Sequence, residues 1–134
     1  LLGVLCSIPL DWIARTVVEL SMNFHILNGL PVPRPDPDSV LRKQVVEIAG
    51  RLAATDERYR KWADEVGVTT GSVADETMKS DLIAELDALV SLLYDLDRDE
   101  VVHVFETFHR GWNYQPRLTA VLSHFDSWKA KVTK

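Results

Sequence analysis

The sequence has almost no cysteine and no stretch rich in glycine. Cys6 is the only cysteine among 134 residues, which excludes an internal disulfide and a cysteine-based metal site and favours a reducing compartment. The six glycines are scattered, so the close-spaced cluster of a phosphate- or dinucleotide-binding loop is missing. Because Cys6 lies among apolar residues, we expect it to be a small core residue rather than a reactive thiol.

Paired catalytic or metal-binding side chains are also lacking. None of the spacings typical of a zinc site occurs among the four histidines, which are His25, His103, His109 and His124. Neighbouring acids such as Glu85 and Asp87 are expected to lie on the solvated surface rather than to form a catalytic pair. No serine lies beside a base, so the sequence contains no complete active site, and we expect no bound cofactor or metal in it.

Long apolar runs and an excess of basic residues are absent as well. The apolar start is interrupted by Asp11, Arg15 and Glu19, so it is neither a signal peptide nor long enough to span a bilayer. The net charge of −5 and the pI of about 5.3 give no overall attraction to nucleic acid or to anionic membranes. These properties predict a cytoplasmic protein without a membrane segment.

Most of the chain has the periodicity of amphipathic helices. Apolar residues recur at spacings near 3.6 in five stretches after the first few residues, approximately 9–20, 40–54, 56–66, 81–96 and 116–134. Asp97 followed by Glu100 is typical of a capping box and predicts a further helix from there. The stretch 68–80 has the composition of a loop. The predicted fold class is therefore mainly α, a helical bundle.

The stretch 23–37, NFHILNGLPVPRPDP, differs from the rest. Phe24 and Ile26 alternate with His25 and Leu27, which indicates a short N-terminal β-strand ending near residue 30. The four prolines at 31, 33, 35 and 37 then favour a stiff, extended connector. A lone strand cannot satisfy its own backbone groups. We therefore expect partner strands upstream of this chain, or self-association as a dimer or soluble aggregate.

Local charge suggests where nucleic acid would bind. Residues 34–61 include seven basic and five acidic residues, a net of +2, whereas residues 71–108 have a net charge of −8. Arg34, Arg42, Lys43 and Arg51 are therefore candidates for contacts with DNA phosphates. Asn23 and His25 are candidates for contacts with base edges. The alternatives are an ordinary solvated helix face for the four cations and structural roles for Asn23 and His25.

The N-terminal stretch LLGVLCSIPLDWIARTVVELSMNFHILNGLPVPRP resembles the end of the target-recognition region in large adenine-specific DNA methyltransferases of restriction–modification and phage-defence systems (type IIG-like). That family shows a pattern like LLGILNSxxFDWxxR followed by NFxxLxxLPxP. The usual NS is replaced here by Cys6 and Ser7. ELDALVSLLYDL, at residues 85–96, resembles a string in the helical tail of the same enzymes. The resemblance covers nearly the whole chain.

The resemblance implies a domain organisation and a function. Residues 1–33 would end an upstream α/β target-recognition domain and contain a late strand of its sheet, residues 34–39 would form the proline-rich connector, and residues 40–134 would form the helical domain. The parent enzyme would use S-adenosylmethionine and bind double-stranded DNA. The catalytic NPPY-type motif and the glycine-containing cofactor motif do not occur in this chain. The expected role is DNA recognition and scaffolding without catalysis; the alternative is a helical protein-interaction module with no DNA role.

Overall fold

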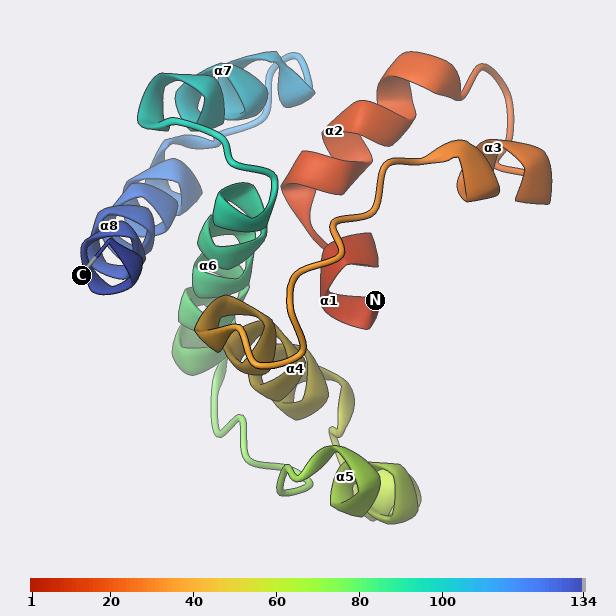
Figure 1. Cartoon of the computed structure of the whole chain (residues 1–134), viewed down its shortest axis with the longest axis vertical. Coiled ribbons are helices and arrows are strands. Elements are labelled where there is room, and N and C mark those ends of the chain that lie inside the picture. Colours follow the sequence, from red (N-terminus) through yellow and green to blue (C-terminus); the bar gives the residue numbers. More distant parts are fainter. Residues whose placement is uncertain (134) are drawn as a thin grey trace.

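Helices make up about two thirds of the computed structural model, which describes residues 1–133 (Figure 1). The helices are α1 Leu2–Leu5, α2 Ile8–Val17, α3 Phe24–Gly29, α4 Val40–Ala53, the 3-10 helix η1 Glu57–Tyr59, α5 Arg60–Val66, α6 Glu76–Leu93, α7 Arg98–Phe108 and α8 Gln115–Val132. Residues 1–133 contain no strand. The predicted mainly helical class is confirmed.

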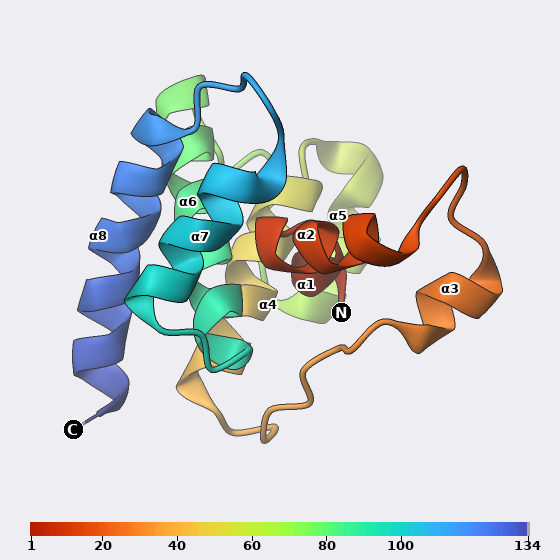
Figure 2. The ribbon, with the colours of Figure 1, turned by 90° about the horizontal axis from the view of Figure 1, so that it is seen from above.

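The long helix α6 is the centre of the fold. It packs against α8 on one side and against α4 on another, while α2 packs against α7 (Figures 1 and 2). Two apolar clusters meet at α6. Leu86 and Leu89 belong to the cluster shared with α1 and α4, and Ala84 and Ala88 belong to the cluster shared with α7 and α8. Because α6 buries both faces, it fixes the positions of the helices around it.

Side-chain caps define the starts of α4, α6 and α7. Ser39 caps α4, and Asp97 forms a capping box with Glu100 at the start of α7, as predicted. The predicted start of α6 at residue 81 is wrong. Asp75 accepts a hydrogen bond from the Met78 amide at 2.8 Å, so the helix begins at Glu76, within the stretch expected to be a loop.

The predicted N-terminal strand is also wrong, because Phe24–Gly29 forms α3. The Asn23 side chain accepts a hydrogen bond from the Ile26 amide at 2.9 Å, which caps the helix. Ile26 and Leu27 are half-buried and Leu30 is buried, so one side of this short segment contacts protein, as a helix of this length allows. The argument for partner strands in a missing sheet therefore no longer applies.

The chain from residue 31 to residue 36 has no regular structure and leads from α3 to α4. Tyr94, at the end of α6, donates a hydrogen bond through its hydroxyl to the Pro31 carbonyl oxygen at 2.7 Å. Leu30 and Val32 pack into the apolar cluster on either side of this bond. The connector is thus fixed to the helical body at Pro31, while α3 lies away from that body (Figures 1 and 2).

One carboxylate, that of Asp87 in α6, is buried at 1% exposure, contrary to the expected place on the solvated surface. Its Oδ1 accepts a hydrogen bond from the Ile8 amide at the start of α2, at 2.9 Å. Its Oδ2 accepts hydrogen bonds from Arg117 Nε at 2.9 Å and Nη2 at 2.6 Å. Burial raises the pKa of the Asp87 carboxyl, and Arg117 and the Ile8 amide oppose that rise. Asp87 therefore joins α2, α6 and α8.

Cys6 is exposed rather than buried, so its predicted place in the core is wrong. It follows the short α1 as the C-cap residue. Ser7 is buried next to it, and its hydroxyl donates a hydrogen bond to the Val4 carbonyl oxygen at 2.7 Å. The turn between α1 and α2 therefore buries the small polar residue and directs the thiol outward.

Replacing Asp87 with alanine is expected to lower the free energy of unfolding by about 3 kcal/mol, because the Ile8 amide and Arg117 would lose their buried acceptor. Urea unfolding followed by circular dichroism measures the change. Asp126→Ala is the control, since Asp126 forms an exposed ion pair with Arg98 and its loss should cost less than about 1 kcal/mol. Equal losses for the two variants would contradict the central role of Asp87.

Gly3→Ala is expected to destabilise the fold by about 1–2 kcal/mol, despite the better helix propensity of alanine. A Cβ at Gly3 would lie 2.8 Å from Val45 Cγ1 and 3.1 Å from Leu86 Cδ1, so α1 would have to move away from α4. Gly29→Ala is the matched control, because a Cβ at Gly29 meets nothing within 4 Å. Thermal and urea unfolding measure the change in the free energy of unfolding that each variant causes. The two changes should have opposite signs or differ by at least about 1 kcal/mol.

Candidate functional site: a cationic groove on α4

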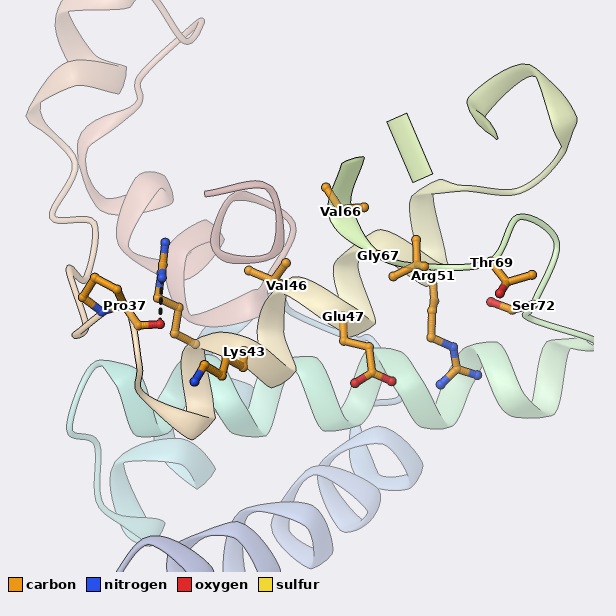
Figure 3. A pocket seen from close by; sticks show the side chains of 11 residues that line it. Pro37, Lys43, Val46, Glu47, Arg51, Val66, Gly67, Thr69 and Ser72 are labelled. Atoms are coloured by element: carbon orange, nitrogen blue, oxygen red, sulfur yellow. Dashed lines mark hydrogen bonds between the residues drawn. The ribbon is translucent and has the colours of Figure 1, made fainter. Parts of the chain in front are cut away.

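A groove of about 690 Å³ lies between the outer face of α4 and the loop 66–72 (Figure 3). We call it the α4 groove. Its lining comprises Pro37, Arg42, Lys43, Val46, Glu47, Arg51, Val66, Gly67, Val68, Thr69 and Ser72. Three cations and one carboxylate give the lining a net charge of +2. A groove of this size and charge is suited to binding an anionic ligand.

The three cations of the groove have few competing partners. Arg42 Nη1 donates a hydrogen bond to the Pro37 carbonyl oxygen at 2.9 Å, and Lys43 forms an exposed ion pair with Asp38 at 3.2 Å. The Arg51 guanidinium lies 3.7 Å from the Met78 sulfur and forms no ion pair within residues 1–133. The positive charges of Arg42 and Arg51 are therefore not neutralised by a carboxylate in the described chain.

Valine side chains form the apolar part of the groove. Val46 on α4 is exposed, and Val66 and Val68 on the opposite wall are half-buried. The two walls approach closely at Gly50, where an added Cβ would lie 3.0 Å from Val68 Cγ1. Glycine at this position thus permits the contact between the loop and α4. The groove therefore combines apolar side chains on both walls with the cations of α4.

Several bonds hold the loop 66–72 in place. Gly67 ends α5 in the left-handed conformation at φ 76°, which favours glycine. The Gly71 amide donates a hydrogen bond to the Ala54 carbonyl oxygen at 2.8 Å. The Thr70 hydroxyl donates a hydrogen bond to Glu57 Oε1 at 2.7 Å. The groove wall is therefore formed before any ligand binds.

The structure brings only some of the predicted site residues together. Arg42 and Lys43 line the α4 groove, whereas Arg34 is exposed on the connector outside it. Asn23 caps α3 with its side-chain oxygen, and His25 is exposed on the same helix. The valine walls could not be anticipated, because Val66 and Val68 follow α4 by more than ten residues with no motif linking them to it.

A second surface lies at the N-terminal side of the chain. Large apolar side chains are exposed from the end of α2 into α3, and we call this the apolar N-terminal surface: Val17, Leu20, Met22 and Phe24. Leu20 is 100% exposed and Phe24 is 82% exposed. Exposed large apolar side chains this close together in the chain make the segment a candidate interaction site.

The aromatic residue Trp112, in the loop between α7 and α8, has a structural role. Its indole stacks on Phe105 with ring centroids 5.9 Å apart, and its Nε1 donates a hydrogen bond to the Phe105 carbonyl oxygen at 3.2 Å. It also contacts Phe108 and Tyr114. The loop between α7 and α8 is therefore attached to the core by Trp112.

Comparison of the chain with protein-family models, with curated proteins and with solved structures finds no match. No helix in residues 1–133 is long and apolar enough to cross a membrane. The same residues contain no group of three or more histidine, cysteine or acidic side chains arranged to hold a metal ion. The candidate site is therefore described from the residues and geometry of this chain alone.

The bond between Glu57 and Thr70 is expected to weaken in acid. Hydrogen bonds from Arg60 and Thr70 hold the pKa of Glu57 below its usual value of 4.5. Because the folded-state pKa is lowered, the stabilisation is present above the unfolded-state pKa and is lost as the pH falls through the folded-state pKa. NMR titration should show the Thr70 and Gly71 amide shifts following the Glu57 carboxyl.

Thr70→Val supplies the control for this titration. The variant removes one donor to Glu57, so the pKa of Glu57 should move back toward its usual value. The response of the loop amides should then disappear. A wild-type titration in which the Thr70 and Gly71 amides do not move with Glu57 would show that this bond does not hold the groove wall.

Proposed function

We propose that this chain is the C-terminal region of an adenine-specific DNA methyltransferase of restriction–modification or related phage-defence type, in which it contributes to DNA target recognition and scaffolding. The resemblance of its N-terminal stretch and of residues 85–96 to those enzymes supports the proposal. The proposal assigns catalysis and S-adenosylmethionine binding to the upstream part of the parent enzyme, and it implies a cytoplasmic location.

The apolar N-terminal surface is the observation that carries the scaffolding role. It lies within the stretch that resembles the end of a target-recognition region, and it presents Leu20 and Phe24 to solvent. Burying two such side chains would contribute about 3–6 kcal/mol before the costs of association. We assign this surface to contact with the upstream methyltransferase domain. Self-association of the separate chain through the same surface would follow from the same exposure.

Contacts with double-stranded DNA are assigned to the cations near the connector. Arg34, Arg42 and Lys43 are exposed and lie within ten residues of one another, on the connector and the first turn of α4. Cations on one edge of a protein position it on the phosphate backbone without reading sequence. Asn23 and His25 lie on the adjoining α3 segment; the Asn23 oxygen caps that helix, which leaves its amide nitrogen and the His25 ring as candidates for base contacts.

A second candidate is a helical protein-interaction module without a DNA role. The apolar N-terminal surface favours it equally, since any protein partner of matching shape would cover Leu20 and Phe24. The strongly acidic stretch 71–108 also opposes DNA over much of the molecule. The two candidates differ in whether the cations near the connector bind DNA.

DNA binding tests the proposal directly. We expect the wild-type chain to bind a labelled 20-base-pair duplex weakly in fluorescence anisotropy at low salt. Replacing Arg34, Arg42 and Lys43 together with glutamine should reduce the affinity by about tenfold or more. The slope of log affinity against log salt should fall by up to about three, one for each lost phosphate contact.

The control carries the same change in net charge elsewhere. Arg58, Arg60 and Lys61 are exposed on η1 and α5, and replacing all three with glutamine should leave most of the affinity. Equal losses in the two triple variants would indicate non-specific charge attraction. Equal losses, or no binding by the wild type, would favour the interaction module over the DNA role.

A further inference from the structure

The two ends of the α4 groove differ from its middle. Lys43 lies at the end next to Pro37, and Arg51 lies with Thr69 and Ser72 at the other end (Figure 3). Val46 and Glu47 lie between them on α4. We propose that the groove binds an extended segment of a partner protein in which two acidic residues flank an apolar residue, in the order acid, any residue, apolar, any residue, acid.

The spacing along α4 sets the length of this motif. Lys43 and Arg51 are eight residues apart, which separates their backbone positions by about 12 Å at about 1.5 Å per helical residue. An extended peptide advances about 3.3 Å per residue, so acidic residues four positions apart are separated by about 13 Å. The first, third and fifth residues also point to the same side of an extended chain. All three motif side chains can therefore face the groove together.

The middle of the groove selects an apolar residue. Val46 is exposed there, and Val66 and Val68 belong to the other wall, where both lie beside Gly50, one helical turn further along α4. Glu47 lies at the same level of α4 and forms no ion pair within residues 1–133, so an anion placed opposite it would be repelled. An apolar side chain between two anions avoids that repulsion and covers the valines.

The same arrangement disfavours a nucleic-acid strand in this groove. A strand of DNA places a phosphate at every 3.4 Å of its axis, so a phosphate would lie opposite Glu47 whenever others contact Lys43 and Arg51. The phosphate backbone also has no apolar group to cover Val46, Val66 and Val68. The carboxylate of Glu47 and the valines of the lining therefore both favour a peptide over a nucleic-acid strand.

The end of the groove at Arg51 is equipped to bind a carboxylate. The Arg51 guanidinium has only the Met78 sulfur as a partner within residues 1–133. Thr69 contributes a hydroxyl to the lining, and the Ser72 Oγ is buried there without a hydrogen-bond partner in the described chain. A guanidinium with adjacent hydroxyl donors forms short, charge-assisted hydrogen bonds with a carboxylate.

This site overlaps the proposed DNA contacts but does not coincide with them. Arg42 and Lys43 belong to both, so a bound peptide and a bound duplex would compete for them. Arg51 belongs to the groove, and Arg34 belongs to the connector outside it. Variants of Arg51 and Arg34 therefore distinguish the two proposals.

Binding of a labelled peptide to the whole chain tests the inference. The probe is a fluorescein-labelled peptide with glutamate, serine, leucine, serine and glutamate in that order between terminal glycines, measured by fluorescence anisotropy. We expect saturable binding by the wild type. Lys43→Gln, Arg51→Gln and Val46→Ser should each weaken it about fivefold, while Arg34→Gln and Lys61→Gln should leave it unchanged. Circular dichroism confirms that each variant is folded.

A peptide of the same composition with both glutamates next to each other is the control ligand, and it should bind at least fivefold more weakly. Equal binding of the two peptides, or no wild-type binding, would overturn the inference. So would an Arg51→Gln variant that loses duplex affinity as much as peptide affinity, because the groove would then be a nucleic-acid site. Peptide binding that persists when the wild type binds no duplex would support the inference and reject the proposed DNA role alone.

Discussion

The buried carboxylate of Asp87 is the constraint on which the arrangement of the helices depends. A single side chain accepts hydrogen bonds from the first amide of α2 and from Arg117 of α8 while lying in α6. An ionised carboxylate at the start of a helix is also favoured by the helix dipole. Apolar packing would tolerate several rotations of α2 against α6, whereas these directional bonds permit only one.

This constraint connects the two candidate surfaces. The apolar N-terminal surface begins at the end of α2, and the α4 groove lies on another helix that packs against α6. Fixing α2 to α6 through Asp87 therefore fixes the base from which α3 extends. A buried ion pair gives little net stability compared with apolar packing, so its value here lies in defining position.

The mainly helical class and most of the helices could be predicted from the sequence, whereas α3, the start of α6 and most of the tertiary detail could not. The Asp97–Glu100 capping box is a local signal and was sufficient to predict the start of α7, whereas the start of α6 was predicted five residues too late. The burial of Asp87 depends on an amide 79 residues away and on Arg117, 30 residues away, so its place in an acidic stretch indicated the surface instead. Alternation over Phe24–Leu27 was too short to separate a strand from a helix, and a side-chain cap decided the outcome. The groove combines residues from α4 with a later loop, which only the fold brings together.

The hydrogen bond from Tyr94 to Pro31 has a consequence for partners that touch both surfaces. It anchors the chain between α3 and α4, so the two surfaces are held on a short tether rather than on a freely coiling linker. When a partner binds one of the two surfaces, the rest of that partner is present at a high effective concentration at the other surface. Two weak contacts then act together as one strong bivalent contact. Without the hydrogen bond from Tyr94 to Pro31, such a partner would make two independent weak contacts in place of one bivalent contact.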